Sequence, residues 1–317
     1  MSYAAAYSLY NYRLDDPSLG LAAYSNLRLI RAFEHGLDPS SSEAGFVLTH
    51  VDMVQHSAGL VRGAVDVLRA SASANDDTTK LPQALDLLLT TMQAVEASME
   101  TMWAHSKPKD YLSYRTFIFG ITNQSMFPNG VIYQGENDNK PMSFRGESGA
   151  NDSMIPLLDS LLQIPFPPNP LTAILKDFRS YRPKPHREFL ASIREQAEAV
   201  GVRERCCNPR TPETALRYLK LLDHVRSFRW RHWMFAREYI VRRSKYPTAT
   251  GGSPMATWLP NQLFAVMDLM VRVWEELKGN AADDGAAFEP DVKEMMERVG
   301  EQRAKLEREV ERWCEEK

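Results

Sequence analysis

Apolar residues recur along most of the chain at intervals of three and four, which is the repeat of a helix with one buried face. The stretches that carry this repeat, with the usual start and stop signals at their ends, predict a series of helices. They lie near residues 18–35, 43–71, 80–105, 109–122, 151–163, 170–180, 186–200, 212–244, 258–278 and 290–315. Strand patterns are scarce, and GVIYQG at 130–135 is the one short candidate. The chain is therefore predicted to be all-α.

Two irregular stretches, 123–149 and 246–254, interrupt the helical pattern and are rich in Gly, Pro, Asn and Ser. Loops of this length in a compact helical domain usually serve function. The segments IPFPPNP at 164–170 and YRPKPH at 181–186 predict rigid connectors, because proline fixes the φ angle and removes a donor.

The last segment, 281–317, contains a densely charged stretch with an apolar stripe, as in an amphipathic helix. The stripe consists of Val292, Met296, Val299, Leu306, Val310 and Trp313. A surface helix that packs on the body is favoured over an oligomerising coiled coil, since Arg303 interrupts the stripe. The oligomeric state stays open, a homo-oligomer included.

The composition is that of an ordinary globular protein, with 317 residues of which 44% are hydrophobic. This is enough for one large domain or two modest ones. The 38 Lys and Arg against 41 Asp and Glu give a net charge of -3, which offers no basic surface for nucleic acid or an anionic membrane. No partner of either kind is expected, and small-molecule chemistry is favoured.

The three cysteines, Cys206, Cys207 and Cys314, are odd in number and include an adjacent pair. This argues against a disulfide framework and for a reducing compartment, so a cytoplasmic location is predicted. No apolar run approaches the roughly 18 residues needed to span a bilayer. The first residues, MSYAAAYSLYNYRLDD, lack the pattern of a signal peptide.

The most informative stretch is HVRSFRWRHWMFAREYIVRR, within the predicted helix 212–244. The apolar stripe of this helix consists of Tyr218, Leu221, Leu222, Val225, Phe228, His232, Phe235 and Tyr239. His232 thus lies on an apolar face, where an imidazole without a partner costs about 1–3 kcal/mol. Periodicity alone leaves two interpretations open, a ligand of a metal centre and a structural histidine.

Another histidine, His50, lies on the apolar stripe of the segment EAGFVLTHVDMVQHSAGLV, one turn after Phe46. Two histidines on buried faces favour a pocket, although two core histidines that each bond to a backbone carbonyl give the same pattern. The segment KDYLSYRTFIFGITN sets Arg115 among Tyr111, Tyr114 and two phenylalanines. Such an arginine suits either bidentate recognition of a carboxylate or a structural cation–π contact.

Several classes of enzyme lack the residues that their chemistry needs. The loops FRGESGANDS at 144–153 and TATGGSP at 248–254 match no phosphate-binding fingerprint. No HExxH or GxSxG occurs, and Cys206 and Cys207 have no partners at zinc-ligand spacing. Nucleotide binding, metallohydrolase and serine hydrolase functions are therefore disfavoured.

Taken in order, seven segments resemble the indoleamine 2,3-dioxygenase family. They are FVLTHV, YRTFIFG, GVIYQG, FRGESGANDSMIP, YRPKPHREFL, FRWRHWMFAREYI and ATGGSPMATWLPNQL, between residues 43 and 265. Order and spacing together make this resemblance more specific than any single segment. It implies a large helical-bundle haem domain of that type.

The resemblance also implies a cofactor site. His232 matches the proximal ligand of the haem iron, and His50 matches the distal position, where it would act in catalysis and accept the indole N–H. Ser148 and Ala150 match the loop over the haem, with Ser148 also counted as catalytic, and Phe228 is expected beside the cofactor. The implied cofactor is haem b, ferrous in the active state, with dioxygen as co-substrate.

The implied substrate site uses residues from other parts of the chain. Arg115 matches the arginine that pairs with the substrate carboxylate, while Phe46, Tyr111 and Leu112 match positions around the indole ring. Gly149, Thr250 and Gly251 match the loops that close over the substrate. Leu112 departs from the aromatic pair that is common in the family, so the resemblance leaves ring specificity open.

The reaction implied is insertion of both atoms of dioxygen across the indole C2=C3 bond of tryptophan or a related indole, giving an N-formylkynurenine-type product. A different oxidation, such as monooxygenation, and a non-catalytic haem-binding role are the alternatives. Because few residues precede His50, three parts are expected: a short helical segment at 1–42 in place of the family's small domain, the haem domain at 43–280 and the charged helix at 281–317.

Overall fold

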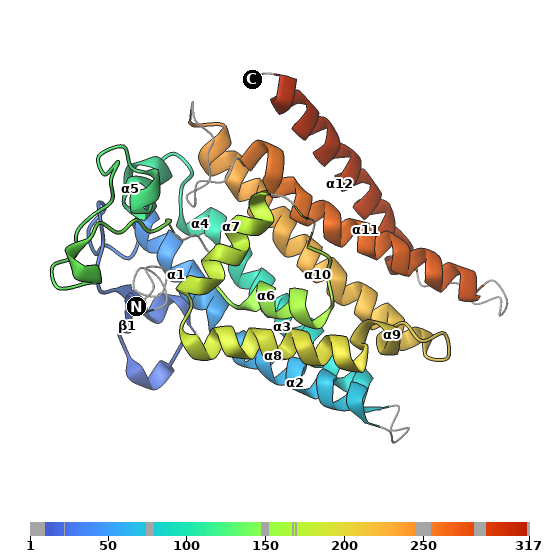
Figure 1. The fold of residues 1–317 in the computed structure, drawn as a ribbon. Coiled ribbons are helices and arrows are strands. Elements are labelled where there is room, and N and C mark those ends of the chain that lie inside the picture. The colour runs from blue at the N-terminus through green and yellow to red at the C-terminus, as the bar shows by residue number, and fades with distance from the viewer. Residues whose placement is uncertain are drawn as a thin grey trace.

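A computed structural model describes residues 10–21, 23–73, 79–146, 152–166, 168, 170–244, 255–281 and 290–315. The chain is built from helices, and the longest of them lie side by side (Figure 1). They are α1 (Ser42–Val54), α2 (Ser57–Ala72), α3 (Lys80–Glu100), α4 (Met102–His105), α5 (Tyr111–Ile118), α6 (Met154–Leu161), α7 (Pro170–Phe178), α8 (Lys184–Val200), α9 (Val202–Cys206), α10 (Pro212–Ala236), α11 (Met255–Ala281) and α12 (Pro290–Glu315). The all-α prediction is confirmed.

Several predicted helices are interrupted in the structure, and two of these interruptions concern the helices of the predicted site. The stretch 43–71 forms α1 and α2, which are separated at Gln55 and His56. The stretch 212–244 forms α10 and then a π-helical turn, η8 (Arg237–Val241). Neither interruption is visible in the sequence, because the apolar stripe continues through both.

The helix predicted near 18–35 is absent, and this prediction is wrong. The structure has a small antiparallel hairpin of β1 (Tyr12–Leu14) and β2 (Leu27–Leu29), with short 3-10 turns at Pro17–Leu19 and Tyr24–Asn26. The Asn26 amide holds the connection closed, since it donates to the carbonyls of Asp16 and Gly20. Such side-chain bonds to the backbone compete with helix formation. GVIYQG forms no strand, and Val131 pairs with Met142 in an isolated bridge.

The N-terminal segment is fastened to α1 by a buried carboxylate. Glu43, in the first turn of α1, is 1% exposed and accepts the backbone N–H groups of Phe33, Glu34 and His35 at 2.6, 3.0 and 2.9 Å. An apolar contact joins the same two segments, because Leu27 and Leu29 of β2 are buried in the same cluster as residues of α1. The hairpin therefore covers one side of α1.

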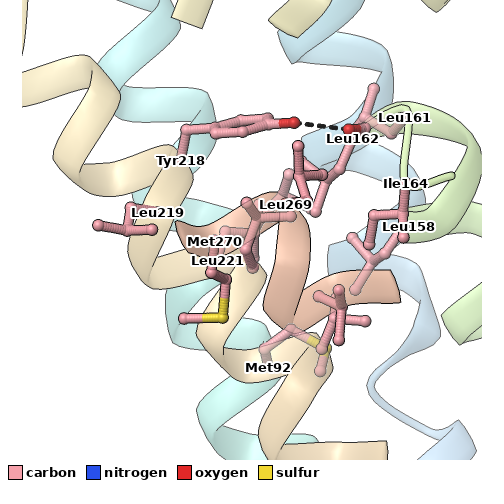
Figure 2. Packing of buried hydrophobic residues seen from close by; sticks show 14 of the residues in the cluster. Met92, Leu158, Leu161, Leu162, Ile164, Tyr218, Leu219, Leu221, Leu269 and Met270 are labelled. Atoms are coloured by element: carbon pink, nitrogen blue, oxygen red, sulfur yellow. Dashed lines mark hydrogen bonds between the residues drawn. The ribbon is translucent and has the colours of Figure 1, made fainter. Parts of the chain in front are cut away.

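The main hydrophobic core joins α3, α10 and α11 with α2, α6 and α8. Leu221 of α10, Met92 of α3 and Met270 of α11 are fully buried within it (Figure 2). Tyr218 is also buried there, and its hydroxyl donates to the carbonyl of Leu162 at 2.6 Å. That bond satisfies the one polar atom which the ring carries into the core.

A second, smaller core joins β2, α1 and α5 to the end of α10 and the π-turn. Helix α10 therefore takes part in both cores. Phe228 packs against the main core, Ala236 belongs to the second, and Phe235 contacts both. Because His232 lies between Phe228 and Phe235 on this helix, it lies where the two cores meet.

Helix α12 lies along α11 at the edge of the molecule (Figure 1). Val292, Val299 and Leu306 of its stripe are fully buried, which confirms the packed surface helix. Arg303 interrupts the stripe but still packs on α11, because its guanidinium pairs with Asp268 and lies over the ring of Phe264. Within the described residues, no helix has both the length and the hydropathy required to cross a bilayer.

Candidate functional site

Helix α1 contributes Phe46 and His50, which lie one turn apart on one face. Nδ1 of His50 lies 2.8 Å from the carbonyl oxygen of Phe46 and donates to it, since a carbonyl can only accept. This fixes the tautomer and leaves Nε2 with a lone pair. Burial lowers the pKa of His50. His50 is therefore a neutral imidazole whose Nε2 is an acceptor.

Helix α5 contributes an aromatic wall beside these two residues. The ring of Tyr111 lies 5.1 Å from the ring of Phe46 and makes edge contacts with Tyr114 and Tyr239 at 5.4 and 5.5 Å. Such spacings are those of favourable aromatic pairs. Leu112 is partly buried and packs against the same cluster. The side of the site that faces α5 is thus apolar and rigid.

Arg115 lies one turn after Tyr111 and is 3% exposed. Its guanidinium carbon is 4.5 Å from the centre of the Phe119 ring, so the cation–π contact, one of the two roles left open by the sequence, is present. Burial lowers the pKa of Arg115, and Tyr111 opposes this effect. An arginine pKa lies so far above neutrality that the side chain keeps its charge. The site therefore contains a desolvated positive charge beside an aromatic wall.

Helix α10 contributes His232, whose side chain is only partly buried although it lies where the two cores meet. Burial, and then the neighbouring imidazole of His50, which disfavours a second proton nearby, lowers the pKa of His232 to about 4. The second effect means that the two imidazoles lie within electrostatic range of each other. Within the described part of the chain, neither ring nitrogen of His232 has a hydrogen-bond partner. His232 is therefore neutral and has a lone pair available.

Ring contacts thus bring together Phe46 and His50 of α1 with Tyr111 of α5, and Arg115 interacts with Tyr111. His232 of α10 interacts electrostatically with His50. Phe228 is one turn before His232 and is partly buried against the main core. The remaining predicted residues, Ser148, Gly149, Ala150, Thr250 and Gly251, lie outside the described residues.

One feature of the site that the sequence does not reveal is the π-turn at Arg237–Val241, directly after α10. Such turns are frequent at functional sites. It carries Tyr239, whose hydroxyl donates to the carbonyl of Ser106 and whose ring contacts Tyr111. Burial raises the pKa of Tyr239 to about 12. Tyr239 therefore joins the end of α10 to the aromatic wall.

Another feature that the sequence does not reveal is a buried ion pair one turn before His232. Nη2 of Arg229 donates to both carboxylate oxygens of Asp159 on α6, at 2.7 and 2.9 Å. The Asp159 side chain is 4% exposed and that of Arg229 is 12% exposed. Burial raises the pKa of Asp159, while the charge of Arg229 opposes this. The pair fixes α10 against α6 close to His232.

Asp159→Ala is expected to lower the free energy of unfolding by about 3–5 kcal/mol, because it leaves the Arg229 guanidinium buried without its countercharge. Urea denaturation measures the effect. The matched control is Asp177→Ala, which removes the half-exposed pair with Arg145 and should cost about 1 kcal/mol or less. Equal losses in the two variants would contradict the structural role given to Asp159.

Comparison with known proteins identifies relatives over most of the chain. The family model described as indoleamine 2,3-dioxygenase matches residues 1–283. Indoleamine 2,3-dioxygenase 1 of Rattus norvegicus is 27% identical over 248 residues, which are 77% of this chain and 58% of that protein.

Two further relatives have different names. The 6-hydroxytryptophan 2,3-dioxygenase of Fusarium equiseti is 25% identical over 228 residues, 70% of this chain and 54% of that protein. A protein named myoglobin from Haliotis diversicolor is 25% identical over 209 residues, 65% of this chain and 54% of that protein. The chain thus spans little more than half the length of these relatives.

Proposed function

Because the chain belongs to the indoleamine 2,3-dioxygenase family, we propose that it is a haem-dependent oxidoreductase that inserts both atoms of dioxygen into an indole amino acid. The observation that carries this proposal is that His232 lies where the two cores meet and has no hydrogen-bond partner among the described residues, with the acceptor His50 on α1 and the buried Arg115 on α5. The proposed substrate is tryptophan or a related indole, and the proposed product is of the N-formylkynurenine type.

The residues at the site fit haem. A histidine binds iron through a neutral imidazole. The pKa of His232, lowered to about 4, keeps this side chain neutral at physiological pH. Its ring nitrogens have no competing hydrogen bond to the described residues. The aromatic side chains one turn to either side of it on α10, Phe228 and Phe235, suit a flat apolar ring. We therefore propose that His232 would hold the haem iron.

When bound, haem would supply the iron that activates dioxygen, and the protein would supply positions and an electrostatic environment. His50 has its Nδ1 proton committed to Phe46, so Nε2 can accept a proton or hydrogen bond from an indole N–H. Because burial lowers the pKa of His50, the imidazole remains an acceptor rather than a cation. In this proposal His50 orients the substrate from the side of α1.

Arg115 and Tyr111 would define the rest of the substrate position. A buried guanidinium pairs strongly with a carboxylate, which would anchor the amino-acid end of the substrate. Tyr111 and Phe46 would pack on the indole ring, with Leu112 at the edge of the wall. The relative named for 6-hydroxytryptophan supports a substituted ring as an alternative to free tryptophan.

The proposal is tested by loading the purified protein with haem, reducing it and adding L-tryptophan or 6-hydroxytryptophan under air. The expected results are a change of the ferrous haem spectrum with substrate and a product heavier by two oxygen atoms. A product with one added oxygen would support monooxygenation instead. If neither substrate changes the spectrum nor yields product, the proposed activity is wrong.

A second candidate is a haem-binding protein without catalysis, which is favoured by the relative named myoglobin. It requires His232 but gives no role to the buried Arg115. Binding of haem without any spectral response to indole amino acids would support it. In either case we propose small-molecule partners and, from the free thiols of Cys206 and Cys207, a reducing cytoplasmic location.

A further inference from the structure

Helix α12 starts at Pro290, beyond the residues 1–283 that the family model matches. It nevertheless contacts α10 directly at the residues beside His232. Its stripe of Val292, Val299 and Leu306 packs into the main core, so α12 is a structural part of the molecule. Helix α12 therefore adds contacts to α10 from outside the part of the chain that the family model matches.

The contact nearest to His232 is made by Glu309. One carboxylate oxygen, Oε2, accepts the indole N–H of Trp233 at 3.1 Å, and Oε1 accepts Nη1 of Arg237 at 2.8 Å. Glu309 is 8% exposed and Trp233 is 1% exposed. A carboxylate in such surroundings is stable because both of its oxygens are hydrogen-bonded and one partner is a cation.

The position of these two partners on α10 matters. Trp233 directly follows His232, and Arg237 is the first residue of the π-turn. Glu309 thus joins the last α-helical turn to the π-turn. Tyr239 lies two residues after Arg237, and its ring contacts Tyr111 in the aromatic wall. One carboxylate therefore holds the segment that carries both His232 and a wall residue.

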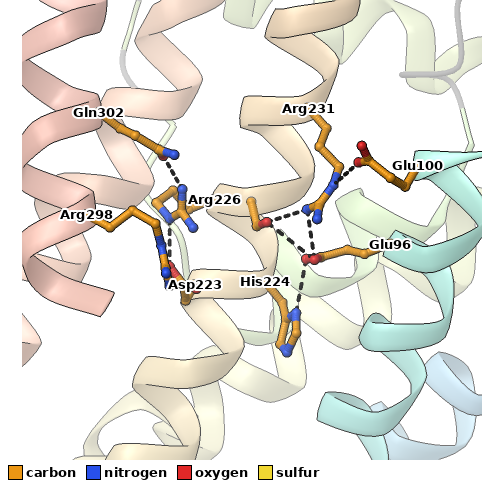
Figure 3. A network of polar contacts seen from close by, with 9 residues as sticks. Glu96, Glu100, Asp223, His224, Arg226, Arg231, Arg298 and Gln302 are labelled. Atoms are coloured by element: carbon orange, nitrogen blue, oxygen red, sulfur yellow. Dashed lines mark hydrogen bonds and ion pairs between the residues drawn. The ribbon is translucent and has the colours of Figure 1, made fainter. Parts of the chain in front are cut away.

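Other contacts hold α10 against rotation on two sides (Figure 3). On the α3 side, Glu96 accepts His224 at 3.0 Å, Ser227 at 3.3 Å and Arg231 at 2.9 Å. On the α12 side, Arg226 donates to Gln302. Glu309 adds to the α12 side the contact that lies closest to His232.

From these contacts we propose that Glu309 is a positioning residue, through which α12 holds the α-to-π junction of α10 and so orients His232 toward the haem iron. The inference rests on the proposed function for the role of His232, while the mechanical part concerns α10 and α12 alone. Loss of the carboxylate would remove the hydrogen bonds to the indole N–H of Trp233 and to Nη1 of Arg237, and would leave Arg237 its pair with Glu238, within the same turn. The contact between α12 and the junction would then be lost, so the junction would open more often.

The test compares Glu309→Ala, Glu309→Gln and Glu311→Gln with the wild type. Glu311 is an exposed glutamate two residues along the same helix and serves as the matched control. Glutamine keeps the size of the side chain, but its NH2 group would face one of the two donors. It should therefore show a smaller effect than alanine, and it decides the test if the alanine variant does not fold.

Two measurements are needed. Hydrogen–deuterium exchange of peptides covering residues 233–244 reports the junction whether or not haem is bound, with peptides of α8 as internal reference. Transfer of haem to an apomyoglobin acceptor reports how firmly His232 holds the iron. For Glu309→Ala we expect exchange and haem loss to be about tenfold faster, the effect of losing a hydrogen bond to a charged group.

Unchanged exchange at 233–244 in both Glu309 variants, as in Glu311→Gln, would overturn the proposal. Faster exchange with unchanged haem loss would overturn its link to His232. A wild type that binds no haem would refute the proposed function instead, and the exchange measurement would still decide whether Glu309 holds the junction.

Discussion

His232→Ala is expected to give a folded protein that no longer retains haem. The side chain is partly exposed and has no hydrogen-bond partner within the described residues, so its removal should disturb the fold little. The haem iron, however, would lose the residue proposed to hold it. Mutation of a residue that merely hydrogen-bonds to a metal-binding histidine lowers metal affinity about 10–100-fold. Loss of the ligand itself should therefore lower haem affinity by more than about 100-fold.

The absorption spectrum after haem titration measures this effect, and circular dichroism verifies the fold. The matched control is His224→Ala, which removes another histidine of α10 whose Nδ1 bonds to Glu96. It should keep haem. Added imidazole should restore a histidine-type spectrum to His232→Ala by occupying the vacated position. An unchanged spectrum in His232→Ala without imidazole would mean that another residue holds the iron.

Arg115→Met is expected to raise the KM for tryptophan by roughly 30-fold or more. Removing one partner of a buried charge pair costs about 2–5 kcal/mol, and each 1.4 kcal/mol is tenfold. Methionine keeps an apolar side chain of similar length against Phe119, so the cation–π contact is lost but the space stays filled. Steady-state kinetics and spectral titration with tryptophan measure the effect.

An indole without a carboxylate, such as tryptamine, separates recognition from structure. The wild type should prefer tryptophan over tryptamine, and Arg115→Met should lose this preference because no carboxylate partner remains. If Arg115→Met weakens the binding of tryptophan and of tryptamine by the same factor, Arg115 acts through the cation–π contact alone. The role proposed for it in carboxylate binding would then be wrong.

The helices were predictable because they depend on local pattern. Burial of one face requires apolar residues at intervals of three and four, and α3, α8 and α12 were recognisable for this reason. The hairpin at 12–29 was missed because its structure depends on the Asn26 amide and on Leu27 and Leu29 packing against α1. The repeat of apolar residues near 18–35 carried no information on either contact.

The sequence also identified His50, Arg115 and His232 as candidates, since charged or titratable side chains among apolar ones require a partner. Whether each was structural or chemical could not be decided from the stripe. In the fold, His50 bonds to the carbonyl of Phe46, whereas His232 has no such bond within the described residues. Only the packing of α1, α5 and α10 separates these two cases.

The residues whose contacts hold α10 in position do not stand out in the sequence. Asp159 and Arg229 are 70 residues apart, and Trp233 and Glu309 are 76 residues apart. A carboxylate in a helical stretch is usually solvated, so neither acid stands out. Local hydrophobic repeats thus determined the helices and the candidate residues. The partners of those residues were decided only by the tertiary structure, because a hydrogen bond between distant segments depends on where these segments meet.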